Sequence, residues 1–346
     1  MLIYWVIFSL LALGALLNQP LGARPFLIAF AFVPTALMIG TRWEIGPDWA
    51  AYVEIFNYTK HYSLTQALAH GDPGFFALQW GLHQLGLPFA AENVVCGTIF
   101  AAGLTAFCSR LPNPWIGFLL AFPYLVIVIG MSGNRQSLAL GIFLFGLNAF
   151  ERRQLSRFIL LTIFAAFFHA SAIIMLPIGL LSYTRNNLQR TALILLGLLI
   201  AYYLFRHTFT IYAHRYSSEN IQSKGVAYRL AMNALPAIIF LRFGQSFVLP
   251  DEQRALWRNI SIVSLLLVVV VFLVPSNTAV DRGVLYLFPL QFFVFSYLPY
   301  LQTDRVASSR FWLTTTICYA GLIQFVFLTF GTFAPSYVPY RSFLLT

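Results

Sequence analysis

Long apolar runs separated by short polar stretches repeat along most of the 346-residue chain. A membrane-spanning helix needs about 20 apolar residues, and about 17 at the lower limit, so each run predicts a helix that crosses a membrane. The runs lie at 2–18, 25–41, 90–107, 115–131, 134–150, 189–206, 226–243, 259–275, 283–300 and 311–331. The pattern therefore predicts an all-α polytopic membrane protein with about 11–12 transmembrane helices, forming a single integral membrane domain over 1–346.

Two stretches depart from this pattern. Residues 75–88 are too short to span a membrane and carry three polar side chains, which indicates an interfacial helix. Residues 157–182 form one apolar stretch that is interrupted by His169 and Pro177. This stretch is either one long span or two short helices that meet near His169.

The loop charges favour the second interpretation of residues 157–182. Basic residues gather in the loops on the inner side of a membrane, and the Arg-rich loop 151–157 marks that side. Two helices place 12 of the 21 basic residues inside and 9 outside, whereas a single span gives 11 and 10. The preferred orientation puts both termini and the loops 42–74 and 207–225 outside.

Composition supports a membrane protein and excludes the main soluble classes. Residues of hydrophobic type make up 59% of the chain and charged residues only 9%, against about 25% in soluble domains. The net charge of +10 rests almost wholly on Arg, since only Lys60 and Lys224 are Lys. This excess fits the inside loops of a membrane protein rather than nucleic-acid binding, and Arg also suits a bidentate grip on phosphate.

Polar residues that bear chemistry gather on the predicted outer side. Ionisable groups at membrane depth are costly, so they point to function. The candidates are Arg42, Asp48, Tyr52, Arg135, Gln136, His169, Arg215, Asp281, Arg282, Tyr286, Tyr337 and Tyr340. Several cations with one carboxylate and one imidazole match the needs of a diphosphate leaving group, held by Arg, and a single base.

Each candidate also has a structural interpretation. These are a snorkelling Arg135, an Asp48 that caps a helix beginning at Trp49, a core His169 bonded to a carbonyl, a local Asp281–Arg282 ion pair, and interfacial Tyr337 and Tyr340.

Phosphate-binding, dinucleotide-binding, zinc-protease and serine-hydrolase motifs are absent from the sequence. Neither the carboxylates nor Cys96, Cys108 and Cys318 have metal-binding spacing, so we expect no metal and no cofactor.

Five short motifs occur in order along the chain. They are Arg42-x-x-x-Gly46-x-Asp48-x-x-x-Tyr52-x-x-x-Phe56, Gly133-x-Arg135-Gln136-x-x-Ala139, Phe168-His169-x-Ser171-Ala172, Arg282-x-x-x-Tyr286 and Tyr337-x-Pro339-Tyr340. In this ordered set the chain resembles the EpsG-like family of bacterial exopolysaccharide polymerases, within the broader Wzy class.

The resemblance implies a fold similar to the C-type glycosyltransferases, in the bacterial inner membrane with the active site facing the periplasm. It implies undecaprenyl-diphosphate-linked oligosaccharides as donor and acceptor, contact with membrane lipid, a chain-length regulator as a further candidate partner, and no nucleic acid. In that light Arg42, Arg135 and Arg282 hold the diphosphate, and either Asp48 or His169 is the base. Further substrate contacts are assigned to Tyr52, Gln136, Arg215, Tyr286, Tyr337 and Tyr340.

Three other functions remain as alternatives. A polysaccharide ligase, or a single-sugar transferase with a polyprenyl-phosphate donor, would use the same groups. A transporter of lipid-linked sugar should show an internal repeat and charges near the midplane of the membrane, and neither is visible. A membrane acyltransferase would use His169 but has little need of so many Arg residues.

Overall fold

The computed structural model describes residues 1–17, 24–183, 186, 188–189, 191–197, 199, 202, 223, 225–274, 277–301 and 306–344. Throughout these residues the regular structure is helical, apart from one isolated antiparallel bridge between Arg42 and Ser342. The prediction of an all-α protein is confirmed. The chain forms two compact units, Met1–Leu144 with Phe295–Thr346, and Phe145–Val294.

Several helices are long and apolar enough to cross a membrane. Within the described residues these are Phe89–Cys108, Val226–Ser246, Asp251–Val270, Thr278–Tyr300 and Ser309–Phe330. Shorter apolar helices cover Leu2–Leu17, Ala29–Gly40, Pro114–Gly130, Leu155–Phe168 and Ala170–Tyr183. The protein is therefore a polytopic membrane protein, while the number of spans, the single domain and the loop 207–225, which lies almost wholly outside the described residues, stay predictions.

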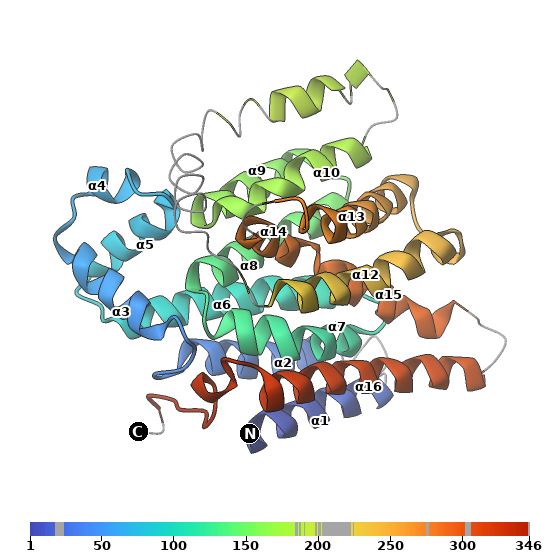
Figure 1. Ribbon diagram of the computed structural model, residues 1–346, viewed down its shortest axis with the longest axis horizontal. Coiled ribbons are helices and arrows are strands. Elements are labelled where there is room, and N and C mark those ends of the chain that lie inside the picture. Colours follow the sequence, from blue (N-terminus) through green and yellow to red (C-terminus); the bar gives the residue numbers. More distant parts are fainter. Residues whose placement is uncertain are drawn as a thin grey trace. The chain divides into compact units, whose positions relative to one another are not determined.

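The first unit contains the elements labelled α1 to α7, the start of α8 and the whole of α16 (Figure 1). Their bounds are α1 Leu2–Leu17, α2 Arg24–Gly40, α3 Trp49–Tyr58, α4 Leu64–Leu68, α5 Pro73–Gln84, α6 Phe89–Cys108, α7 Pro114–Ala121, α8 Asn134–Glu151 and α16 Val306–Phe330. A π-helical segment, Phe122–Gly130, continues α7. The predicted interfacial helix 75–88 corresponds to α5, and its position at a membrane surface stays a prediction.

Glycines bring α6 against both α2 and α8. A Cβ on Gly97 of α6 would lie 2.8 Å from the backbone nitrogen of Gly40 in α2. A Cβ on Gly141 of α8 would lie 2.6 Å from the Cα of Phe100 in α6. Such small residues let membrane helices approach closely. This packing brings the end of α2 and the beginnings of α6 and α8 together, where the polar side chains lie.

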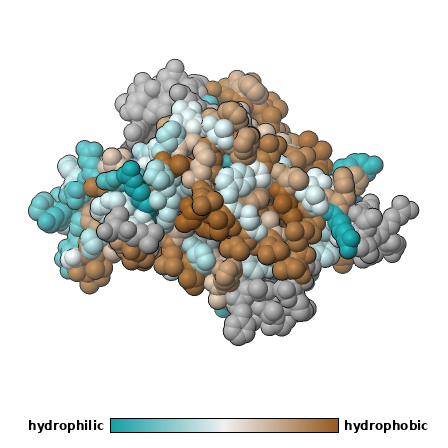
Figure 2. Space-filling view, turned by 90° about the horizontal axis from the view of Figure 1, so that it is seen from below, coloured by the Kyte–Doolittle hydropathy of each residue, from teal (hydrophilic) through white to brown (hydrophobic). Residues whose placement is uncertain are grey.

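The surface of the first unit differs between its parts. Figure 2 shows hydrophobic residues over α1 and α16 and hydrophilic residues gathered where α3, α4 and α5 lie. On α1, Leu2 is 79% exposed, and on α16, Phe330 is 72% exposed. Exposed apolar surfaces of this kind suit contact with lipid rather than water.

In the second unit, the break predicted at His169 is confirmed. α9 (Leu155–Phe168) ends there, His169 is extended (φ −156°, ψ 113°), and a 3₁₀ turn leads into α10 (Met175–Tyr183). The two helices lie side by side (Figure 1), and a Cβ on Gly179 would overlap the ring of Phe158. The stretch is therefore a helical hairpin, because the end of α10 packs beside the beginning of α9.

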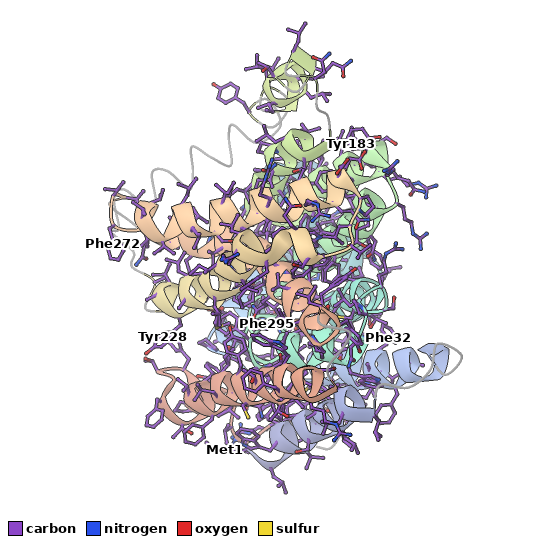
Figure 3. All side chains as sticks on the ribbon, turned by 90° about the vertical axis from the view of Figure 1, so that its right-hand side faces the viewer. Met1, Phe32, Tyr183, Tyr228, Phe272 and Phe295 are labelled. Atoms are coloured by element: carbon purple, nitrogen blue, oxygen red, sulfur yellow. The ribbon has the colours of Figure 1, made fainter. Side chains whose placement is uncertain are left out.

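This unit also contains the second part of α8, α12 (Val226–Phe243), α13 (Asp251–Val270), α14 (Thr278–Val284) and the first part of α15 (Pro289–Tyr297). α12 and α13 pack in opposite directions, so Tyr228 and Phe272 lie at the same end of the pair (Figure 3). The predicted bounds 259–275 were wrong, because α13 begins at Asp251. Asp251 and Glu252 form an acidic first turn after Pro250, which favours a helix start.

Candidate functional site

The chain turns sharply after α2 at Gly46. This residue has a φ of 92°, which favours glycine, and a Cβ there would lie 2.5 Å from the Met131 carbonyl oxygen. Its N–H donates to the Ser336 carbonyl oxygen at 2.9 Å. The turn holds the chain close to the residues before α8 and leads it into α3.

Asp48, directly before α3, is exposed and points at the beginning of α8. Its Oδ2 accepts a hydrogen bond from the Ser132 hydroxyl at 2.7 Å. α3 does begin at Trp49, but Asp48 makes no capping bond, since its own backbone is helical (φ −90°, ψ 0°). The capping interpretation is therefore wrong. Among the described residues Oδ1 has no hydrogen-bond partner, so this oxygen can accept a proton.

Residues 336–343, which we call the C-terminal clamp, run beside the loop that follows α2. The N–H of Trp43 donates to the Arg341 carbonyl oxygen, and the N–H of Phe343 donates to the Thr41 carbonyl oxygen, each at 3.0 Å. The side-chain oxygens of Thr41 and Ser342 are 2.8 Å apart in a further hydrogen bond. The clamp thus fixes the loop that carries Asp48.

Tyr337 and Tyr340 fasten the clamp to helix ends. The Tyr337 hydroxyl donates to the Val128 carbonyl oxygen at 3.2 Å, and the Tyr340 hydroxyl donates to the Met38 carbonyl oxygen at 3.0 Å. Tyr337 is almost wholly buried, at 1% exposure. The structure therefore gives both residues an anchoring function, and their contact with substrate stays a prediction.

Arg42 lies inside the first unit rather than on its surface. It is 1% exposed, and its guanidinium donates to the carbonyl oxygens of Ile39 at 3.0 Å and Gly130 at 3.3 Å. It also donates to the side-chain oxygen of Asn134. All of these partners are neutral, and they hold the end of α2 against the residues around the start of α8.

A buried carboxylate completes this arrangement, which we call the amide network (Arg42, Gln79, Glu92 and Asn134). Glu92 of α6 is fully buried and accepts hydrogen bonds from Gln79 at 2.8 Å and from the Asn134 amide at 2.6 Å. Asn134 therefore joins the Arg42 guanidinium to the Glu92 carboxyl group. Burying such groups is costly unless they are hydrogen-bonded, and the network supplies hydrogen bonds to both.

Arg135 forms an ion pair that the sequence did not reveal. Its Nη1 lies 2.9 Å from Oδ2 of Asp72, whose side chain is fully buried while that of Arg135 is 27% exposed. The guanidinium carbon lies 5.9 Å from the ring centre of Tyr52 and 6.0 Å from that of Phe75. The snorkelling interpretation is thus wrong, because a carboxylate and two rings hold this side chain.

Tyr52 connects Arg135 to α3. Its hydroxyl accepts a hydrogen bond from the backbone N–H of Arg135 at 3.4 Å. Burial raises the pKa of the Tyr52 hydroxyl, although Arg135 acts in the opposite direction, so the hydroxyl stays neutral. Next to it, Gln136 is partly exposed. Three predicted residues therefore lie together here in the first unit, namely Asp48, Tyr52 and Arg135, and Gln136 is the next residue of α8.

Three other predicted residues belong to the second unit. His169 is 4% exposed, Tyr286 is fully buried, and Arg282 on α14 is partly exposed. Their convergence with the residues of the first unit stays a prediction. Arg215 lies outside the described residues.

The second unit has a polar cluster of its own, formed by Ser223, Arg229, Asn277 and Asp281. Asp281 pairs with Arg229 of α12 and accepts a hydrogen bond from the Ser223 hydroxyl at 2.8 Å. The Asn277 side-chain oxygen accepts from the Ser223 N–H at 2.6 Å. The interpretation of Asp281 and Arg282 as a local ion pair is therefore wrong, since the partner of Asp281 comes from another helix.

Sequence reasoning missed Asp72, Glu92 and Asn134 as parts of the site. A signal existed for Glu92, because it is the one acidic residue inside the apolar run 90–107. No comparable signal marks Asp72 or Asn134, whose partners are distant in sequence. In the described part of the chain, no group of three His, Cys, Asp or Glu residues is placed to hold a metal ion.

Fold and site together define a helical, polytopic membrane protein whose polar centre lies where α2, α3, α6 and α8 meet. The chain belongs to the EpsG family, whose model matches residues 26–342, nearly the whole chain. Membership confirms the resemblance in the motifs and indicates a function of the exopolysaccharide polymerase type. Neither a curated protein nor a solved structure matches the chain.

Proposed function

We propose that the protein is a polymerase that joins undecaprenyl-diphosphate-linked oligosaccharide repeat units into a polysaccharide. The observation that carries the proposal is that a carboxylate and a guanidinium both lie near the beginning of α8. An exposed Asp48 carboxylate is fixed by Ser132, and the partly exposed Arg135 guanidinium lies three residues further along the chain. One base and one anion-binding cation are what glycosyl transfer from a diphosphate requires.

In the proposed reaction, a hydroxyl of the acceptor sugar attacks the anomeric carbon of the donor chain. The bond between that carbon and the diphosphate oxygen breaks, and undecaprenyl diphosphate leaves with the electron pair. The hydroxyl proton passes to the free oxygen of Asp48. Arg135 stabilises the charge that develops on the diphosphate.

The other predicted residues take different parts in this proposal. Arg42 is a positioning residue, because its buried guanidinium holds α2 and α8 at the site. Arg282 stays a proposed diphosphate ligand, and His169 stays the alternative base. We further propose that the site faces the periplasm and that a chain-length regulator is a partner.

The lipid-linked intermediates that accumulate in a strain without the protein test the proposed function. We expect single lipid-linked repeat units to accumulate, because polymerisation is the step that consumes them. Mass spectrometry of the extracted lipids measures this. Accumulation of finished polymer on lipid would instead indicate a ligase, and unchanged lipids would contradict both functions.

Restoration of polymer by variants then tests the site. Asp48→Asn keeps the size of the side chain but is a poor proton acceptor, so we expect a loss of about 10²–10⁴-fold in turnover. Glu44→Gln is the matched control, because Glu44 is another exposed carboxylate of the same loop, 2.9 Å from Arg341. If Asp48→Asn kept more than about a tenth of the turnover, Asp48 would not be the base, and His169→Gln would be measured next.

Cysteine labelling tests the orientation of the site. In a Cys-free background, a cysteine at the exposed position Glu44 should react with a membrane-impermeant maleimide added to intact cells with a permeable outer membrane. A cysteine at the exposed position Arg152, in the Arg-rich loop, should react only after the inner membrane is opened. The reverse pattern would place the site in the cytoplasm.

A further inference from the structure

The exposed face of α3 carries a shallow hollow directly beside Asp48. Its volume is about 490 Å³, and its lining residues are Trp49, Ala50, Val53, Glu54 and Asn57. An α-helix rises about 1.5 Å per residue, so the hollow follows α3 for about 12 Å away from Asp48.

The spacing of these residues gives α3 two different faces. Residues four apart lie on the same side of a helix, which places Trp49, Val53 and Asn57 in one row. Tyr52 and Phe56 lie on the neighbouring side of the helix and are buried in the first unit. The hollow therefore lies beside the buried face of α3, on a side where Ala50, Glu54 and Asn57 are exposed.

The indole ring of Trp49 is held in place before any ligand arrives. Its centre lies 5.6 Å from that of Trp43 and 5.1 Å from that of Phe89, and both rings meet it edge to face. The Arg42 guanidinium carbon lies 5.9 Å from the same ring. A ring that is already fixed loses little freedom when a ligand packs against it.

The polar groups of the hollow have free hydrogen-bonding capacity. Among the described residues, neither the Glu54 carboxylate nor the Asn57 side-chain amide has a hydrogen-bond or ion-pair partner. They offer acceptors and donors beside an apolar ring, and a sugar offers hydroxyl edges beside an apolar C–H face. A phosphate headgroup fits poorly, because the lining includes one carboxylate and no cation.

We propose that this hollow binds the oligosaccharide of the acceptor repeat unit. The sugar lies along α3, with its terminal hydroxyl beside Asp48 and a ring packed against Trp49. This assignment rests on the proposed function and adds to it a binding subsite for carbohydrate. It makes Val53, Glu54 and Asn57 residues that determine acceptor affinity but not the chemical step.

Measurements of KM and kcat on variants that fill or alter the hollow test the proposal. In purified full-length protein, Val53→Arg fills the hollow, so the KM for the lipid-linked repeat unit of the producing strain should rise at least about tenfold while kcat changes little. Glu54→Gln and Asn57→Ala should each raise KM about two- to tenfold, as expected for the loss of one hydrogen bond. Ala51→Arg is the matched control, because Ala51 is exposed on α3 but does not line the hollow.

Direct binding separates a failure of this proposal from a failure of the proposed function. The probe is the water-soluble repeat-unit oligosaccharide, released from its lipid by mild acid and followed by saturation-transfer NMR with the Asp48→Asn protein. Binding should be seen with Asp48→Asn and with Asp48→Asn combined with Ala51→Arg, and it should vanish when Asp48→Asn is combined with Val53→Arg. Equal binding or equal KM in the Val53→Arg and Ala51→Arg proteins would overturn the subsite. Full turnover by Asp48→Asn, with binding still lost in Val53→Arg, would instead overturn the catalytic base.

Discussion

The two units hold their buried charges in different ways. In the first unit, the Arg42 guanidinium and the Glu92 carboxyl group are joined through the neutral amide of Asn134. In the second unit, Arg229 and Asp281 meet directly, and their side chains are 15% and 10% exposed. The Arg229–Asp281 pair and the contacts of Asp281 and Asn277 with Ser223 join α12, the start of α14 and residue 223, whereas the amide network joins four segments. This difference indicates that the first unit is built to hold a fixed geometry, as a preorganised site requires.

The largest expected effect comes from removing the carboxyl group of the amide network. Glu92→Leu leaves one N–H of Gln79 and one N–H of Asn134 without an acceptor, so the free energy of unfolding should fall by about 2–6 kcal/mol, at about 1–3 kcal/mol for each unsatisfied donor. A thiol-reactive dye measures the loss during heating, because it reports exposure of the buried Cys96 and Cys108 once the exposed Cys318 is replaced by Ser. Asp281→Leu, in the second unit, should lower the unfolding temperature less, because its pair is partly exposed. Equal losses would remove the distinction between the two units.

The next effect concerns the turn that carries Asp48. Gly46→Ala forces a side chain into a left-handed conformation and against the Met131 carbonyl oxygen, at a cost of roughly 1–3 kcal/mol. We expect polymer yield to fall, because Asp48 moves away from Ser132. Gly86→Ala is the control, since Gly86 also has a positive φ of 66° but open space around it. If both variants reduced the yield equally, strain alone and not the position of Asp48 would be responsible.

A smaller effect is expected from a variant that tests how Arg135 binds the diphosphate. Arg135→Lys keeps the charge but loses the forked geometry, so kcat/KM should fall at least tenfold, equivalent to about 1.4 kcal/mol of transition-state binding. Arg282→Lys makes the same exchange in the second unit and shows whether that unit also contacts the diphosphate. A normal kcat/KM in Arg135→Lys would leave Arg135 as a structural partner of Asp72.

The smallest effect lies at the edge of the first unit, where His70 stacks between Tyr62 and Phe76. Burial lowers the pKa of His70 below its ordinary value of 6.5. The unfolded chain therefore takes up this proton at a higher pH than the folded chain. Stability from the neutral ring is complete above pH 6.5 and declines as the pH falls toward the lowered pKa. His70→Phe should flatten this part of the melting-temperature profile, and an unchanged slope would show that other groups cause it.

The sequence predicted the helical class, the break at His169 and the proximity of Asp48, Tyr52 and Arg135. These follow from hydropathy runs and from a few polar residues inside them, which are local signals. The partners of the charged groups could not be predicted. Asp72, Glu92 and Asn134 reach their partners only after α5, α6 and α8 pack. The same limit explains the three wrong structural interpretations, those of Asp48, Arg135 and the Asp281–Arg282 pair, since each depended on contacts with another segment.

The C-terminal clamp sets an order on the synthesis of the protein. Thr41 and Ser342 are hydrogen-bonded across 301 residues, and the first unit uses chain from both sides of the second. While the ribosome is still making the second unit, Gly46 has no Ser336 to bind and the loop that carries Asp48 is not closed. A nascent or prematurely terminated chain therefore inserts its early helices without a finished centre. The site can form only after residues 336–343 have been synthesised.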